Sequence, residues 1–467
     1  MTLPREEMSI KKLCFSSKKM AESPLSMLQK MANYFDPHIL MLLLNFHREI
    51  GTIDGKWVAM QKIRVAMNTN MIDLIRDEFN IYKDDNDMKA LNKSMENDLN
   101  DKKSLILSQI NNLETENVKK VIELFKNNDK EKLIEVLKDL NINSFTTAYN
   151  ITQEMMLEYY KYAKFKYECG QYSEAEAMLA NYLIPTGMVG HDKERLGAYW
   201  GRLACYIMLG NWESSCHVLE SLKKYIERMS VASEQLVQRA WLLHWALFVQ
   251  FNQRDDRDLH FDIFSDRSYV QTIENLCPWM MRYHIASIII SNRRRVSDRF
   301  KEIKSFETDY EDSFTEFIKC LYEKFDFDEA KIKLEACKKC IKNDFFLQVH
   351  ETKFIYKARS LICEVYCTIN HTVDLPSLAS KLELSEEEAE KWMVDMVRNA
   401  SFSSALDARI DSSSKRVVMS SPTKLALQDI MERTRDLTTR TSNLMGNLDS
   451  LLSDQALYIR DRRSIVE

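Results

Sequence analysis

The scarcity of glycine and proline constrains the fold of this chain more than any other feature. Only nine of its 467 residues are glycine and seven are proline, far below the usual share of either. Tight turns, β-bulges and phosphate-binding loops rely on these two residues, whereas long helices need few of them. The sequence therefore predicts an all-α chain, long enough for about three folding units.

Composition also narrows the class of function. The 65 basic and 70 acidic residues leave a formal charge of −5, so no overall positive field attracts nucleic acid and any RNA contact must be local. Apolar runs such as residues 39–44 are far shorter than the roughly 20 residues of a membrane span. The first residues show no apolar secretory segment, and ten cysteines without one are typical of a reducing compartment. We expect a cytoplasmic protein with no membrane contact.

Residues 1–25 are basic and lack a sustained period, which predicts a flexible lead-in to an N-terminal helical region at 26–150. Asp36 and Pro37 suit an N-cap and a first helical position before the apolar run that follows them. Near residues 84–103, Asp, Asn and Lys dominate and apolar residues are sparse. That stretch predicts an exposed, charged connection.

Residues 151–366 carry a weak internal repeat. A helix, a short turn, an aromatic residue and a second helix recur at residues 159–179, 203–222 and 321–337. Such hairpins stack in tetratricopeptide-like arrays, because one hairpin cannot bury its apolar face alone. Unrelated helix–turn–helix junctions would give a similar pattern. Because the third copy is unevenly spaced, we favour an irregular helical solenoid over a regular array.

His244 is the most conspicuous histidine, in a segment (241–252) that is apolar on nearly every side and predicts a buried helix. It shares one helical face with Trp241, Trp245 and Phe248. A lone histidine on such a face is more often a hydrogen-bonded core residue than a catalytic one. We interpret His244 as part of the core.

Residues 367–420 have the pattern of a winged helix. The predicted order is a short strand, two helices and a small β-hairpin, at residues 372–374, 375–382, 386–399, 405–411 and 416–419. Ser385 with the three glutamates after it suits a capping box at the second helix. Along that helix five acidic residues outnumber two basic ones, and such a face repels the phosphates of DNA.

A long C-terminal helix is predicted at residues 421–455, before a tail at 456–467. Its apolar residues recur every seven positions, at Ile430, Leu437, Leu444 and Leu451. A narrow stripe at this spacing on an otherwise polar helix is typical of a helix that packs against a partner helix. We predict that these four side chains bind another chain.

The nucleotide-binding motifs GxxxxGK[ST] and GxGxxG, the nucleophile motif GxSxG and the zinc motif HExxH are missing from the sequence. The spacing of Cys337, Cys340, Cys363 and Cys367 would allow a four-thiolate zinc site, but the first pair lies in a charged helical stretch without glycine. We therefore predict no enzyme, no metal, no cofactor and no small-molecule substrate. The basic residues at 293–301 form the best local positive patch. We interpret it as a solvated loop or helix end, with a contact to ribosomal RNA or to an acidic protein as the less favoured alternative.

A helical solenoid that leads into a winged helix and a terminal helix resembles the plan of the PCI-domain family, found in the proteasome lid, the signalosome and translation initiation factor three. Within that family, several segments are similar to the e subunit of eukaryotic translation initiation factor three. They are YKYAKFKYECGQYSEA (Tyr160–Ala175), QRAWLLHWALFVQFN (Gln238–Asn252), LCPWMMRY (Leu276–Tyr283), FIKCLYEKFDFDEA (Phe317–Ala330), NDFFL (Asn343–Leu347), EEAEKWMVDMVRNA (Glu387–Ala400) and, more loosely, YFDPHILMLLLNF (Tyr34–Phe46).

The resemblance implies a PCI domain at roughly residues 230–420 and a non-catalytic scaffold subunit that supports recruitment of messenger RNA to the small ribosomal subunit. The implied partners are other PCI subunits and the d subunit of the factor, the small ribosomal subunit and, indirectly, messenger RNA. It also implies that Arg416, Val417, Val418 and Met419 form an edge strand that extends a partner's sheet. The alternatives are a PCI subunit of the proteasome lid or signalosome and, less favoured, a winged-helix regulator that binds nucleic acid.

Overall fold

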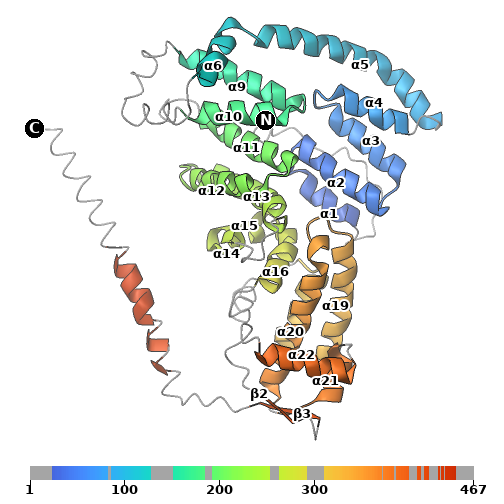
Figure 1. The fold of residues 1–467 in the computed structure, drawn as a ribbon, viewed down its shortest axis with the longest axis vertical. Helices are drawn as coiled ribbons and strands as arrows, with labels where there is room; N and C mark the ends of the chain where they lie inside the picture. Colours follow the sequence, from blue (N-terminus) through green and yellow to red (C-terminus); the bar gives the residue numbers. More distant parts are fainter. Residues whose placement is uncertain are drawn as a thin grey trace, which may run out of the picture. The chain divides into compact units, whose positions relative to one another are not determined.

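The structure, a computed structural model, divides the chain into two compact units, Met1–Ile362 and Cys363–Glu467. It describes residues 24–81, 86–127, 151–184, 192–252, 262–291, 310–370, 372–382, 385–398, 408–411, 415–419, 430–431, 433–435, 437–446 and 448. Apart from one small sheet, the described elements are helices (Figure 1). The predicted helical fold with a small winged-helix module is confirmed.

The first unit opens with four helices, α1 (Pro24–Ala32), α2 (Pro37–Ile50), α3 (Gly55–Ala66) and α4 (Ile72–Ile81). Asp36 caps α2 as predicted, since its carboxylate accepts a hydrogen bond from the backbone N–H of His38 at 3.1 Å. Pro37 occupies the first turn, and Gly51 ends the helix at φ +71°. The hydroxyl of Tyr167 also donates to Asp36, at 2.9 Å, so the cap ties α2 to the solenoid.

The prediction of a connection near residues 84–103 is wrong. The chain there forms the long helix α5 (Asn86–Leu113), and α6 (Glu116–Asn127) follows. Leu99 and Ile106, seven positions apart, are buried in one cluster with Ile75 and Phe79 of α4. These two apolar residues hold α5 on the domain, and the charged residues around them, Glu96, Asp98, Asp101 and Lys103, are exposed on the solvated face of the helix.

The solenoid begins with two helical hairpins and a buried helix, which stack in chain order (Figure 1). They are α9 (Gln153–Glu168) with α10 (Tyr172–Leu183), α11 (Asp192–Leu209) with α12 (Trp212–Glu227), and α13 (Ala232–Phe251). Gly170 and Gly210 make the turns at φ +84° and +69°, a left-handed conformation that glycine adopts without steric cost. The first two predicted hairpins are therefore confirmed.

The rest of the first unit continues as short helices and a third hairpin. The elements are α14 (Asp262–Ser265), α15 (Arg267–Leu276), η2 (Pro278–Met280), α16 (Met281–Ile290), α18 (Ser313–Lys319), η3 (Cys320–Lys324), α19 (Phe327–Lys342), η4 (Gln348–His350) and α20 (Glu351–Ile369), which runs on into the second unit. In the third hairpin, α18 and its π-helical extension η3 pair with α19.

The winged helix consists of β1 (Thr372–Asp374), α21 (Leu375–Leu382), α22 (Glu386–Arg398), β2 (Ala408–Asp411) and β3 (Arg416–Met419). Its three strands are antiparallel in the order β1-β3-β2, with Val417 opposite both Val373 and Ile410. The prediction that residues 416–419 form an edge strand is therefore wrong. The strand is central, because the short strand before α21 pairs with its free side.

The described part of the chain contains no helix with both the length and the apolar character that a bilayer span requires.

Candidate protein-interaction site

The predicted partner-binding strand β3 holds its own sheet together. The side chain of Val417 is fully buried, whereas Arg416 and Val418 are exposed. Arg416 donates to Asp374 of β1 at 2.9 Å, and Met419 pairs with Ala408 of β2 through its backbone. The edges that a partner's strand could reach are those of the outer strands β1 and β2.

Helix α22 has the capping box that the sequence predicts. The backbone N–H of Ser385 donates to the carboxylate of Glu388 at 3.1 Å, and the N–H of Glu388 donates back to the hydroxyl of Ser385 at 3.3 Å. Hydrogen bonds from the backbone and side chain of Ser385 lower the pKa of Glu388. Ala389 and Met393 are buried against the domain, which leaves acidic Glu387 and Glu388 exposed on a helix unsuited to phosphate.

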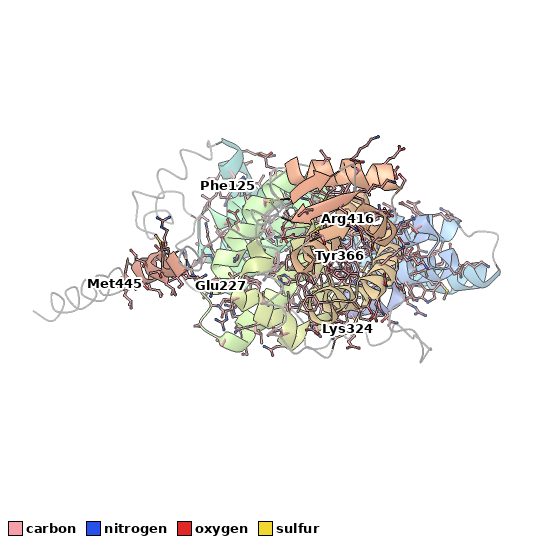
Figure 2. The ribbon with its side chains drawn as sticks, turned by 90° about the horizontal axis from the view of Figure 1, so that it is seen from below. Phe125, Glu227, Lys324, Tyr366, Arg416 and Met445 are labelled. Atoms are coloured by element: carbon pink, nitrogen blue, oxygen red, sulfur yellow. The ribbon has the colours of Figure 1, made fainter. Side chains whose placement is uncertain are left out.

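The C-terminal stripe of apolar residues lies on a helix whose described residues fall between 430 and 448. The exposed fractions are 60% for Ile430, 62% for Leu437 and 62% for Leu444, while Leu451 lies outside the described residues. Met445, labelled in Figure 2, and Leu448 are exposed by 61% and 56%. Five large apolar side chains at this level of exposure form an apolar surface of the kind found at protein-interaction sites, and partner binding by the stripe stays a prediction.

Several threonine hydroxyls of this helix form hydrogen bonds with its own backbone. The hydroxyls of Thr434, Thr438 and Thr441 donate to the backbone carbonyls four residues before them, at 2.7 to 2.8 Å. Because these three hydroxyls are satisfied within the helix, a partner that covers the leucines would not leave them without a hydrogen bond.

His244 is a core residue, as predicted. Its Nδ1 lies 2.7 Å from the carbonyl oxygen of Ala240, and the indole N–H of Trp279 donates to its Nε2 at 3.1 Å. Since an indole only donates, Nε2 must accept and Nδ1 must carry the proton. The ring also stacks on Tyr34 at 4.1 Å. Burial lowers the pKa of His244 to about 4, so the ring is neutral and both of its nitrogens are occupied.

The four cysteines considered as zinc ligands are reduced thiols. Cys337, Cys363 and Cys367 are buried, and the sulfurs of Cys363 and Cys367 lie 3.7 Å apart on adjacent turns of α20. Among the residues that the structure describes, no group of three or more His, Cys, Asp or Glu side chains is arranged to hold a metal ion.

A buried ion pair stiffens the solenoid between α16 and α18. The guanidinium of Arg282 donates to Asp312 at 2.9 Å and lies 4.0 Å from Asp344. Tyr283 donates to the same carboxylate of Asp344 at 2.9 Å. Desolvation by burial raises the pKa of Asp344. This network joins α16 to the N-terminus of α18 and to the segment after α19 through buried polar contacts.

The structure also contains a surface groove that the sequence did not predict. A groove of about 1040 Å³ lies where the start of α11, the end of α12 and the start of α13 meet. It is lined by Lys193, Arg195 and Arg228 together with Asp192 and Glu234, so its charges nearly cancel. No sequence signal marks it, because its residues come from three separate helix ends.

Comparison with known proteins adds two family matches. Residues 26–166 match the family described as eIF3 subunit 6 N terminal domain. Residues 334–421 match the PCI domain family, a range that includes the whole winged helix.

Full-length relatives are similar along most of the chain. A Bombyx mori protein, named as the E subunit of eukaryotic translation initiation factor 3, is 32% identical over 437 residues, covering 91% of this chain and 95% of the relative. A Caenorhabditis elegans protein of the same name is 32% identical over 439 residues, covering 93% and 99%. A Drosophila willistoni protein, named as the E-2 form of that subunit, is 34% identical over 430 residues, covering 89% and 93%.

Proposed function

This chain belongs to the family of the E subunit of eukaryotic translation initiation factor 3, and on that premise we propose that it acts as a non-catalytic scaffold subunit of that factor. In this role the helical arm provides length and surface, the winged helix contacts neighbouring PCI domains, and the C-terminal helix joins a bundle formed with sister subunits. The observation that carries the proposal is the similarity along 91% of the chain to a relative of that name.

The C-terminal stripe supports the bundling role. Ile430, Leu437 and Leu444 recur every seven residues and are each exposed by about three-fifths. Covering such side chains with a partner helix removes apolar surface from water, which favours association by about 25 cal/mol for each Å² buried. Leu451 continues the same spacing in the sequence and belongs to the proposed surface.

The winged helix can contact neighbouring subunits, but through other strands than the β3 strand that the sequence suggests. Because β3 is central, a sister subunit would pair with β1 or β2, or pack against the exposed faces of Arg416 and Val418. Both modes use backbone or surface groups and need no substrate pocket.

The absence of catalysis is part of the proposal. The histidine that most invites a catalytic interpretation, His244, is buried with both ring nitrogens in hydrogen bonds. Burial also raises the pKa of Cys277 to about 12, which keeps that thiol protonated and unreactive.

The proposed partners are the other PCI subunits and the d subunit of the factor, together with the small ribosomal subunit in the cytoplasm. Messenger RNA recruitment would be indirect, since the chain has a formal charge of −5 and α22 presents acidic side chains.

Affinity purification of the tagged full-length chain, followed by mass spectrometry with and without ribonuclease, tests this function. We expect initiation-factor subunits in both samples and small-subunit ribosomal proteins alongside them. Recovery of proteasome-lid or signalosome subunits in their place would contradict the proposal, and so would the recovery of the chain alone. Loss of the sister subunits after ribonuclease treatment would contradict a protein-mediated scaffold.

A further inference from the structure

The C-terminal stripe is part of a longer pattern that includes two threonines. A second series with the same seven-residue spacing runs beside the stripe, at Thr434, Thr441 and Leu448. From Ile430 to Leu448 the two series alternate in steps of four and three residues, and Leu451 continues them in the sequence. This alternation is the heptad repeat of helices that pack side by side, with the threonine series at the a positions and the stripe at the d positions. The two series together are called the seam below.

The two threonines of the seam can be buried by a partner although they are polar. The hydroxyl of Thr434 donates to the carbonyl oxygen of Ile430 at 2.7 Å, and the hydroxyl of Thr441 donates to that of Leu437 at 2.8 Å. Burial of a hydroxyl is costly only where the hydroxyl loses its hydrogen bond. Because both hydroxyls are satisfied by their own helix, the methyl groups are available for contact, and β-branched residues at a with leucine at d are a common combination in coiled coils.

The two flanks of the seam differ in chemistry. On one flank, Met431 and Met445 occupy e positions and are exposed by 66% and 61%. On the other flank, the g positions hold Arg433 and Arg440, which are both exposed. Arg440 takes part in no ion pair within the described part of the chain. Residues seven apart lie about 10.5 Å apart along a helix, so this flank presents positive charge at a regular interval.

The spacing and the flanks together indicate what covers the seam. A surface with side chains every 3.5 residues interlocks with another helix, whose own side chains recur at the same period. A second copy of this chain is a poor match. In parallel packing, g positions face e positions, so Arg440 would face methionine or threonine, and in antiparallel packing arginine would face arginine. The matching helix therefore belongs to another polypeptide and is acidic where it meets the arginines.

We propose that the seam, with Thr434 and Thr441 inside the contact, packs against a helix of a sister subunit that carries acidic side chains seven residues apart, opposite Arg433 and Arg440. The exposed methionines add a third apolar column, a width typical of a helix in a bundle rather than in an isolated pair. This inference rests on the proposed function, because it assumes that a sister subunit supplies the helix. It adds which residues the contact uses and the chemistry of the partner.

The test measures the affinity of the full-length chain for the purified initiation factor assembled without it. The seam variant combines Thr434→Asp with Thr441→Asp. Its matched control combines Thr439→Asp with Ser442→Asp, which lie at f and b positions, away from the seam. All four residues are exposed, and both variants place two aspartates in the same helix, so any effect of aspartate on the helix itself is shared.

We expect the seam variant to bind more than about 100-fold more weakly than the wild type, because it forces two carboxylates into an apolar contact. The control should bind within about twofold of the wild type. Thr434→Val combined with Thr441→Val should bind at least as tightly as the wild type. It keeps the methyl groups and removes only hydroxyls that the partner does not use.

The acidic partner is tested separately. Arg440→Glu should weaken binding by about 5- to 10-fold, because it replaces attraction by repulsion at an exposed flank. Arg435→Glu is the control, since Arg435 is exposed at a b position, and it should change the affinity by about twofold or less. A photoreactive leucine analogue at position 448, in the same column as the threonines, should crosslink to a sister subunit in a helix with acidic side chains seven residues apart.

Equal affinity of the seam variant and its control would overturn the seam, and so would loss of binding in the valine variant. The acidic partner would be overturned if Arg440→Glu and Arg435→Glu bound equally well. It would also be overturned by a crosslink from position 448 to RNA, to a second copy of this chain or to a segment without such acidic residues. If the seam variant does not fold, the arginine variants and the crosslink decide. Failure of the wild-type chain to bind the remaining factor would instead contradict the proposed function.

Discussion

Removal of the negative charge of Asp312 should destabilise the helical arm far more than removal of the negative charge of Glu311, the residue before it. One oxygen of the Asp312 carboxylate caps α18 by accepting from the N–H groups of Phe314 and Thr315 at 3.1 and 2.9 Å. The other accepts from Arg282 at 2.9 Å, and the side chains of this ion pair are only 2% and 9% exposed. Asp312→Asn keeps an oxygen for the cap and removes the nearer of the two carboxylates that neutralise Arg282.

The magnitude follows from burial. Removing one partner of a buried ion pair costs up to about 3–5 kcal/mol, because the other charge stays in the interior, where Arg282 then keeps only the more distant carboxylate of Asp344, 4.0 Å away. The unit Met1–Ile362 has an unfolding entropy of roughly 0.76 kcal/mol/K if each residue contributes about 2.1 cal/mol/K. The melting temperature of that unit should then fall by up to roughly 4–7 °C. Asp312→Ala should lower it further, because the cap itself is worth about 0.5–2 kcal/mol.

Glu311→Gln is the matched control. Glu311 pairs with Lys319 at 3.1 Å, but these side chains are 64% and 41% exposed, and an exposed pair contributes about 0–1 kcal/mol. Differential scanning calorimetry of the full-length variants measures both changes. If Asp312→Asn lowers the melting temperature no more than Glu311→Gln does, the argument from the buried ion pair is refuted.

Three further predictions concern the core, the sheet and a turn. Burial lowers the pKa of His244 and His47 to about 4, below the value of about 6.5 for an exposed histidine. The free energy of unfolding should therefore be full above pH 6.5 and fall by about 3 kcal/mol for each histidine as the pH drops to 4. Urea unfolding at a series of pH values measures this change. Val417→Ala should destabilise the winged helix by about 1.5–3 kcal/mol, because Val417 is fully buried. Val418→Ala should cost less than half of that, because Val418 is 43% exposed. Hydrogen exchange of the β3 amides compares the two variants. Gly210→Ala should cost about 1–2 kcal/mol through backbone strain alone, since a Cβ at that position meets nothing within 4 Å; a change in melting temperature close to zero would contradict this reasoning.

Local chemistry was enough to predict much of the fold. The N-cap at Asp36 and the capping box of Ser385 with Glu388 form as expected, because a cap depends on residues within one turn of it. The buried place of His244 followed from the apolar residues around its helical face. Gly170 and Gly210 marked their turns because positive φ favours glycine.

Non-local pairing was the main source of error. Residues 372–374 were recognisable as a strand, but nothing in their sequence says which strand they join. Their pairing with β3 converts a predicted edge strand into the centre of the sheet. The cross-strand pair of Asp374 and Arg416 is the only signal that could have suggested it, and pairs of opposite charge are too common to decide a register.

Local composition led to a second wrong prediction, that of a connection near residues 84–103. The stretch near residues 84–103 is charged enough to suggest a connection, yet Leu99 and Ile106 anchor a long helix there.

The central claim is that the C-terminal stripe holds this chain in a complex of sister subunits. Sedimentation of cell extracts that contain Leu437→Asp combined with Leu444→Asp tests it most directly. Thr439→Asp combined with Ser442→Asp is the control, because these exposed residues lie on the polar side of the same helix. The account predicts that the leucine variant leaves the initiation-factor fractions and melts at the wild-type temperature, while the control stays with the factor. Continued sedimentation of the leucine variant with the factor would contradict the account.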